Sequence, residues 1–241
     1  MSIWTQLGTF LNSVTENALS GIVEAVRTVF SGDPETRRRV AFSVAIIALS
    51  AKMAKADGVV TMEEVGAFQQ IFHVPPREHK NVERLFNLAK QDVAGFESYA
   101  ARVADLCSGD KTCTTSLEDV LEGLFHIAKA DGVIHERELF FLETTAGIFG
   151  ISRTSFERIL ARHAVTGEPN PYIVLGIAPG ISFVDAQRSW RKLVKDNHPD
   201  LMEARGVPKE FLLIANDRIR AINAAWSRLS PDLKRAELAR A

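Results

Sequence analysis

The chain has 241 residues, enough for two modest domains, since single domains most often contain roughly 100–150 residues. Hydrophobic residues make up 46% of it and charged residues 24%, which is typical of a folded globular protein and excludes a disordered or fibrous one. The 29 Lys and Arg residues nearly balance the 30 Asp and Glu residues, so we expect no nucleic-acid partner, which would need a large positive field.

Residues 1–32 are predicted to form an amphipathic N-terminal segment. Its apolar residues recur at helical spacing, namely Ile3, Leu7, Phe10, Leu11, Val14, Ile22, Val26 and Phe30. A helix with this pattern either packs on its own domain or lies at a membrane surface as an interfacial helix or docking arm. The first alternative is favoured, because the segment lacks the Lys and Arg bias of membrane-surface helices.

Neither a cleavable signal nor a membrane span is evident in the sequence. The longest nearly uncharged apolar stretch, Val40–Ala51, is too short for the roughly 20 residues that a membrane-spanning helix needs. We therefore expect a cytoplasmic protein, which would be peripheral at the inner membrane only if residues 1–30 contact lipid.

Residues 33–165 are predicted to be a helical domain with an internal repeat. Apolar residues recur every three to four positions along it, which is the helical period and indicates an all-α protein. The sequence Ala-Lys-Ala-Asp-Gly-Val at residues 54–59 returns at residues 128–133. A glutamate follows the Asp of each copy by seven positions, so two related helix-turn-helix units are predicted.

The acidic residues of the two repeat turns raise the question of a metal site. Their spacing matches the second half of an EF-hand loop, but Met53, Lys55, Ile127 and Lys129 stand where the first half needs oxygen ligands, so an EF-hand is excluded. The favoured interpretation is helix capping and salt bridges. The alternative is one divalent ion held jointly by four carboxylates, those of Asp57, Glu64, Asp131 and Glu138.

Through these Lys-Ala-Asp-Gly turns and their trailing glutamates, the region is similar to the TerB family, a helical domain associated with tellurite resistance and stress systems. The resemblance implies that divalent metal could bind at the same four acidic residues. It also supplies a second hypothesis for the whole chain, a metal-responsive stress-resistance protein that acts through this domain.

Residues 166–170 are predicted to be a linker, because they are rich in turn-forming residues, and residues 171–241 a second module. Apolar residues at helical spacing in its two long segments predict an antiparallel helical hairpin. Pro199 cannot continue a helix, so the first of these helices is predicted to end just before it. The turn would then present His198 and Asp200 to solvent.

This module resembles a J domain from end to end. The resemblance is carried by Tyr172-x-x-Leu-Gly, Trp190-Arg-Lys-Leu, His198-Pro-Asp and Ile222-Asn-Ala-Ala-Trp, in the expected order and spacing. It implies a module that is not itself an enzyme, needs no cofactor, and recruits a DnaK-type chaperone whose ATP hydrolysis it stimulates. The residues implied in partner binding are Arg188, Arg191, Lys192, Lys195, Asn197, His198, Pro199 and Asp200.

A TerB-like domain followed by a J domain, with an Arg205-Gly-Val-Pro segment after the tripeptide, resembles the DjlA class of DnaJ-like co-chaperones. Members of that class are typically anchored to the inner membrane by an N-terminal helix, whereas residues 1–30 here are amphipathic. Leu201 also replaces a lysine that often follows the tripeptide. Our main hypothesis is therefore a cytoplasmic stress-response co-chaperone in which the TerB-like domain localises or regulates the J domain.

Overall fold

The computed structural model describes residues 3–13, 34–56, 66, 68–69, 71–91, 95–106, 111–130, 132–163 and 168–239, and all regular elements in these ranges are helical. The prediction of an all-α fold is confirmed. The α-helices are α1 (Ile3–Ser13), α3 (Pro34–Ala56), α5 (His79–Gln91), α6 (Phe96–Leu106), α7 (Lys111–Ala128), α8 (Glu136–Ile148), α9 (Arg153–Arg162), α10 (Pro171–Leu175), α11 (Phe183–Asp196), α12 (Pro199–Ala204) and α13 (Leu213–Leu238). Two short 3-10 helices, η1 (Pro76–Glu78) and η2 (Lys209–Phe211), complete them.

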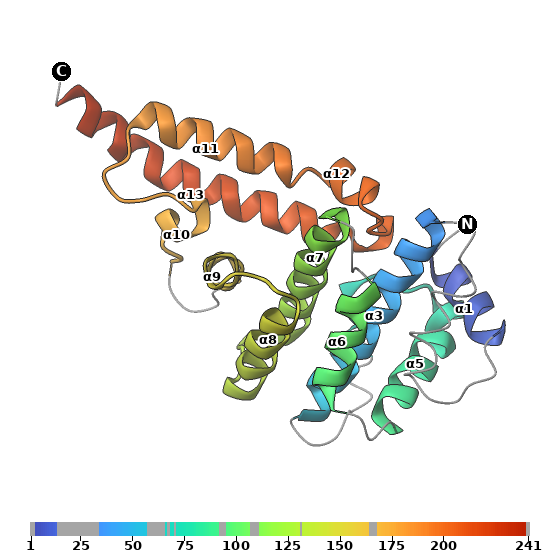
Figure 1. Cartoon of the computed structure of the whole chain (residues 1–241). Helices are drawn as coiled ribbons and strands as arrows, with labels where there is room; N and C mark the ends of the chain where they lie inside the picture. Colours follow the sequence, from blue (N-terminus) through green and yellow to red (C-terminus); the bar gives the residue numbers. More distant parts are fainter. Residues whose placement is uncertain are drawn as a thin grey trace.

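Helix α3 is the centre of the larger of two hydrophobic cores (Figure 1). Its residues are buried without interruption from Phe42 to Met53, which is the pattern of a helix covered on all sides. Helices α1, α5, α6, α7 and α8 pack around it. Helix α7 approaches α3 closely because Gly123 of α7 has no side chain, and a Cβ there would clash with Ile46 of α3.

The N-terminal helix α1 packs on this same core. Ile3, Trp4, Leu7, Phe10 and Leu11 are all buried in it, so the apolar stripe faces the protein's own interior. This arrangement is the one favoured from the sequence for these residues. The second half of the predicted segment, with Val14, Ile22, Val26 and Phe30, lies outside the described residues.

Helices α11 and α13 form the predicted antiparallel hairpin. The ring centroids of Phe183 and Trp226 lie 5.7 Å apart, and the indole N–H of Trp190 donates to Asn223 at 2.9 Å. Later residues of α11 therefore meet earlier residues of α13, as two helices running in opposite directions require. Together with α10 they enclose the smaller core, made of Val174, Leu175, Ala186, Ile222, Ala225, Leu229 and Leu233.

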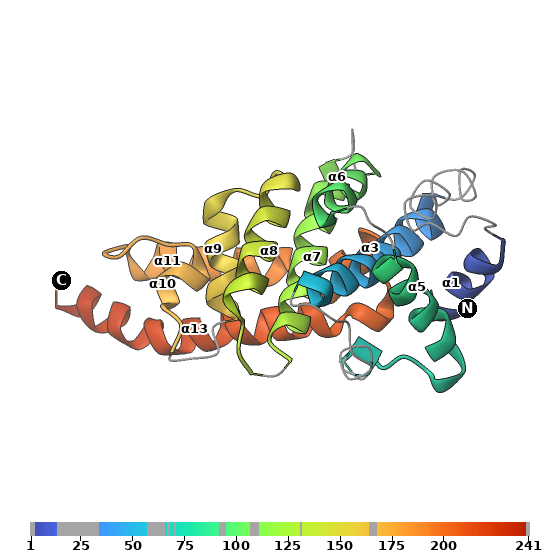
Figure 2. The ribbon, with the colours of Figure 1, turned by 90° about the horizontal axis from the view of Figure 1, so that it is seen from below.

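The two cores are joined by the chain that follows the turn at residues 198–200. Apolar residues of this stretch belong to the larger core, namely Met202, Val207, Phe211, Ile214 and Ala215. The Phe211 ring lies 4.7 Å from that of Phe72 and 5.4 Å from that of Trp4. Helix α13 then continues from the larger core into the smaller one (Figure 2). The domain limits expected from the sequence stay predictions, but the two parts are packed together at this joint.

Candidate functional site

The His-Pro-Asp turn is built as the N-terminus of a short helix. Helix α11 ends at Asp196, just before Pro199, as predicted, and α12 begins at Pro199 itself. His198 is the N-cap, and Pro199 occupies the first helical position, where its missing N–H is not needed. The turn is therefore held by ordinary helix-start geometry and not by strained backbone.

The side chains of the turn face solvent. The His198 side chain is 53% exposed and that of Asp200 is 87% exposed. His198 Nδ1 accepts the backbone N–H of Asp200 at 3.3 Å, which requires Nδ1 to be unprotonated and leaves the ring proton on Nε2. Nδ1 also lies 3.4 Å from the Asp200 carboxylate, so a doubly protonated ring would pair with that group instead. In the neutral form, Nε2–H is a donor directed away from these contacts.

The cations predicted to bind the partner are displayed on the outer surface of α11. Arg188, Arg191, Lys192 and Lys195 are all exposed. Arg188 pairs with Asp185 at 2.7 Å and Lys192 with Asp196 at 2.8 Å, both one helical turn away. Within the described part of the chain, Arg191 and Lys195 have no ion-pair partner, so their charges are fully available to another molecule.

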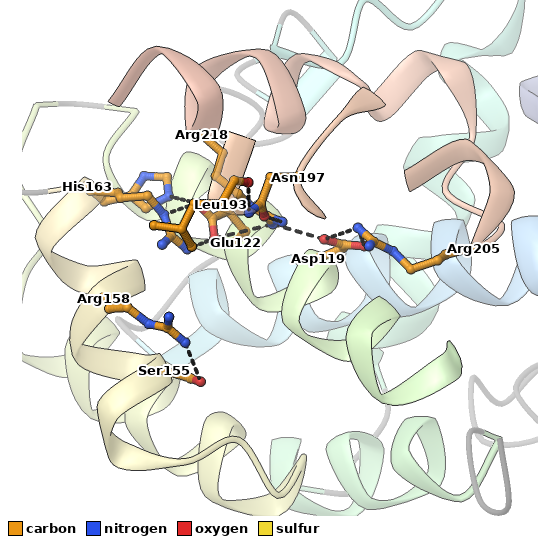
Figure 3. A network of polar contacts seen from close by, with 10 residues as sticks. Asp119, Glu122, Ser155, Arg158, His163, Leu193, Asn197, Arg205 and Arg218 are labelled. Carbon is orange, nitrogen blue, oxygen red and sulfur yellow. Dashed lines mark hydrogen bonds and ion pairs between the residues drawn. The ribbon is translucent and has the colours of Figure 1, made fainter. Parts of the chain in front are cut away.

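Asn197, the remaining predicted partner-binding residue, is oriented differently from these cations. Its amide donates to the Leu193 carbonyl oxygen at 2.7 Å and accepts from Arg218 Nη1 at 2.9 Å. Its side chain is half-buried and engaged inside the protein (Figure 3). Its role in partner binding stays a prediction, but its side-chain amide is occupied by internal contacts.

Directly behind Asn197 lies a buried ionic cluster that joins three helices (Figure 3). Helix α7 contributes the carboxylates of Asp119 and Glu122, whose side chains are 0% and 1% exposed. Arg218 of α13 contacts both, at 3.0 Å and 3.4 Å. Arg162, at the end of α9, holds Glu122 through two hydrogen bonds of 3.1 Å and 2.7 Å.

The same cluster contacts the chain beyond the turn. Arg205, which follows α12, pairs with Asp119 at 3.1 Å and donates to the Asp196 carbonyl oxygen at 3.4 Å. The turn is thus flanked on one side by the Asn197–Arg218 contact and on the other by Arg205. Both arginines converge on Asp119.

Burial and pairing determine the charge states of this cluster. Burial alone would raise the pKa of Glu122, but the Arg162 and Arg218 guanidiniums outweigh it and hold the pKa well below its usual value of 4.5. Burial likewise opposes the charge of Arg218, yet Glu122 and Asp119 raise its pKa above the usual value. Glu122 is therefore ionised and Arg218 charged at neutral pH, although both are buried.

Two histidines complete the cluster in the neutral form. Burial lowers the pKa of His126 to about 3, and His163 contributes to the same shift. Burial also lowers the pKa of His163, although the hydrogen bond from its Nε2 to Glu122, 3.3 Å long, opposes the shift. Both rings are neutral at pH 7, so His163 adds a hydrogen bond and His126 packs against it with the ring centroids 4.8 Å apart, and neither adds further charge.

The sequence prediction did not include this cluster, although one feature of the sequence indicates it. Asp119, Glu122 and His126 recur at helical spacing, so they share one face of α7. That helix is otherwise buried and apolar around them, with Val120, Leu121, Leu124 and Phe125 in the core. A charged stripe on a buried helix predicts buried partners, but not which ones.

The acidic turns proposed as a metal site are only partly described. Asp57, Glu64 and Asp131 lie outside the described residues. The carboxylate of Glu138 accepts the backbone N–H of His135 at 2.8 Å, as one half of the capping box that starts α8. Within the described ranges there is no group of three or more His, Cys, Asp or Glu side chains placed to hold a metal ion.

Among the described helices, none is both long and apolar enough to span a bilayer.

Comparison with known proteins finds one matching family and several similar co-chaperones. Residues 43–161 match the family of tellurite resistance protein TerB. The co-chaperone protein DjlA of Photobacterium profundum is 27% identical over 215 residues, covering 78% of this chain and 76% of that protein. DjlA of Vibrio parahaemolyticus is 24% identical, covering 81% and 79%, and DjlA of Vibrio cholerae is 23% identical, covering 83% and 80%. No solved structure matches the chain.

Proposed function

Because the chain is related to co-chaperones of the DjlA class over most of its length and contains a TerB segment, we propose that it recruits a DnaK-type chaperone and stimulates its ATP hydrolysis. The residues that couple docking to hydrolysis are His198, Pro199 and Asp200. The protein contributes no catalytic group to that reaction and needs no cofactor of its own. The proposal places this turn in the cytoplasm, together with the partner and its ATP.

The observation that carries the proposal is the exposure of His198 and Asp200 at the end of a hairpin whose helices are held together by the smaller hydrophobic core. An exposed imidazole N–H and an exposed carboxylate offer one donor and one acceptor in a defined geometry. Their backbone belongs to a capped helix start, so the contacts require little ordering on binding. Such a preorganised pair suits short-range contacts with a polar cleft on another protein.

The cations of α11 have a separate role in the proposal. Arg191 and Lys195 are exposed, and Arg188 and Lys192 are paired only with exposed acids. Charges of this kind attract an acidic surface from a distance and accelerate encounter, and they contribute less to the strength of the final complex. The partner surface should therefore be acidic, and binding should weaken as salt increases.

The test is the substitution His198→Gln, measured by single-turnover ATP hydrolysis of a DnaK-type chaperone with and without this protein. Glutamine keeps polar atoms but not the imidazole geometry, so stimulation should fall to the unstimulated rate. Helix α8 provides a matched control, because His135 is also an exposed histidine at a helix N-cap. The variant His135→Gln should stimulate like the unsubstituted protein. Full stimulation by His198→Gln would remove the proposed mechanism.

A further inference from the structure

The His-Pro-Asp turn and the TerB-like helices are connected by a continuous set of short polar contacts. Asn197 directly precedes His198, and its side-chain oxygen accepts from Arg218 at 2.9 Å. Arg218 in turn contacts Asp119 and Glu122 of α7 at 3.0 Å and 3.4 Å (Figure 3). Only two side chains therefore separate the α7 carboxylates from the backbone of the turn.

A second branch reaches the turn from its other end. Arg205 pairs with Asp119 at 3.1 Å, and its other terminal nitrogen donates to the Asp196 carbonyl oxygen at 3.4 Å. It thus contacts the last residue of α11 while its own backbone closes α12, where its N–H donates to Leu201 and Met202 carbonyl oxygens. The turn lies between two arginines that share one buried carboxylate.

We propose that Asp119 and Glu122, in the TerB-like half of the chain, are positioning residues for the His-Pro-Asp turn and act on it through Arg218, Asn197 and Arg205. This inference rests on the proposed function and deepens it. The J-domain-like module is then not an independent unit, because the geometry of its tip depends on helix α7. The TerB-like half holds the turn of the second half in position through this contact.

The burial of the cluster favours a positioning role over general stabilisation. Asp119 is 0% exposed and Arg218 is 4% exposed, so both charges are removed from water. Buried ion pairs of this kind often contribute no more to stability than apolar residues of similar volume, because desolvation offsets their attraction. They do require one arrangement of donors and acceptors, since any other leaves a charge unpaired. A cluster that reaches the turn therefore constrains the turn to one geometry.

The first experiment measures stimulation of the partner's ATPase by the full chain carrying Asp119→Asn. Asparagine is isosteric but uncharged, so Arg218 and Arg205 lose their shared anion. We expect maximal stimulation to fall on the order of tenfold, because small misplacement of a contact residue has large effects on rate. The partner concentration that gives half of the maximum should change little, since the exposed cations of α11 remain. Glu157→Gln is the matched control, because Glu157 is an exposed acid of α9 paired with Arg153.

The second experiment separates positioning from a merely structural role. Asn197→Ala removes the bond from Arg218 Nη1 and the bond from the same amide to the Leu193 carbonyl oxygen, and it leaves the ion pairs between α7 and α13 in place. If Asp119 acts through Asn197, the two substitutions should not add. Maximal stimulation by the double variant Asp119→Asn/Asn197→Ala should then be no lower than that of whichever single variant stimulates less. Two independent effects on stability would multiply instead. Multiplying effects, or unchanged maximal stimulation by folded Asp119→Asn, would overturn the inference.

A third measurement needs no partner and so distinguishes failure of this inference from failure of the proposed function. The backbone N–H groups of Leu201 and Met202 donate to the His198 carbonyl oxygen at 2.9 Å and 3.2 Å. Hydrogen exchange at these amides should accelerate at least tenfold in Asp119→Asn and stay unchanged in Glu157→Gln. Unchanged exchange in Asp119→Asn contradicts the positioning role, even where stimulation is observed. A wild-type chain that stimulates no DnaK-type ATPase contradicts the proposed function, whatever the exchange shows.

Discussion

The outer surface of α11 and the cluster behind Asn197 are both rich in charge, yet they differ in almost every physical respect. On α11 the cations are exposed and are paired with exposed acids or with none. In the cluster, carboxylates and guanidiniums are withdrawn from water, and Asp119, Glu122 and Arg218 each contact more than one charged partner. Exposed charges are screened by solvent and mainly affect encounter, whereas buried charges must remain paired and mainly determine geometry. The turn lies where these two kinds of charge meet.

The largest effect on stability should come from removing a carboxylate of the buried cluster. In Glu122→Ala, Arg162 loses the carboxylate that it holds, and Arg218 keeps only its ion pair with Asp119. We expect the free energy of unfolding to fall by about 3–5 kcal/mol, because removing one partner from a buried set of ion pairs is strongly destabilising. Urea denaturation followed by circular dichroism measures it.

The control for Glu122→Ala is another acid of the TerB-like half. Glu143 of α8 is exposed and lies 3.6 Å from Arg153, which is also exposed. The variant Glu143→Ala should lose at most about 0.5 kcal/mol, as is usual for exposed pairs. Equal losses in the two variants would mean that burial does not distinguish the two kinds of charge in this protein.

The second effect is a loss of stability at acid pH that originates in the same cluster. The pKa of His126 is lowered to about 3 in the folded protein, against 6.5 for an unperturbed group. Between these values the unfolded state binds more protons, so the free energy of unfolding decreases as the pH falls below about 6.5. The lowered pKa values of His163 and Glu122 act in the same direction, the latter below its usual 4.5.

We expect the protein to be less stable at pH 5 than at pH 7 by about 2 kcal/mol from His126 alone. Denaturation curves at the two pH values measure the difference. The variant His126→Gln removes one titrating group, so its stability should depend less steeply on pH. A dependence as steep as that of the unsubstituted protein would show that His126 is not the group responsible.

The comparison also explains which parts of the molecule could be predicted from sequence. The hairpin of α11 and α13, the end of α11 before Pro199 and the exposure of His198 follow from local patterns. Proline chemistry and helical periodicity act over a few residues, and a single sequence contains that information. The burial of the apolar stripe of α1 follows in the same way.

The cluster and the joint between the two cores could not be predicted, because they depend on pairs far apart in the chain. Arg205 and Arg218 pair with Asp119, although helices α8, α9, α10 and α11 lie between them in the sequence. Nothing local distinguishes these arginines from those on the exposed surface of α11. Phe211 likewise lies far along the chain from Trp4 and Phe72, against which it packs. Tertiary packing selects these partners, and one sequence does not specify it.

The third effect concerns the exposed cations of α11 and the rate of association with the partner. Arg191 is an exposed cation of α11 that makes no ion pair within the described residues. In Arg191→Glu the association rate with a DnaK-type partner should fall several-fold at low salt, on the order of 1 kcal/mol, and the difference should shrink as salt is added. Stopped-flow association measured across a salt series tests this. A defect that persists in high salt would point to a short-range contact instead of steering.

The smallest effect should come from an exposed ion pair within the same helix. Arg188 and Asp185 pair at 2.7 Å, and their side chains are 74% and 54% exposed. Replacing the arginine in Arg188→Gln should lower the free energy of unfolding by only about 0.2–0.5 kcal/mol, since the pair is screened and must order two mobile side chains. Chemical denaturation of the two proteins side by side is sensitive enough to separate this from the loss in Glu122→Ala. A loss of several kcal/mol here would mean that the outer surface of α11 also holds the fold together, and the division between charges that steer and charges that position would no longer describe this molecule.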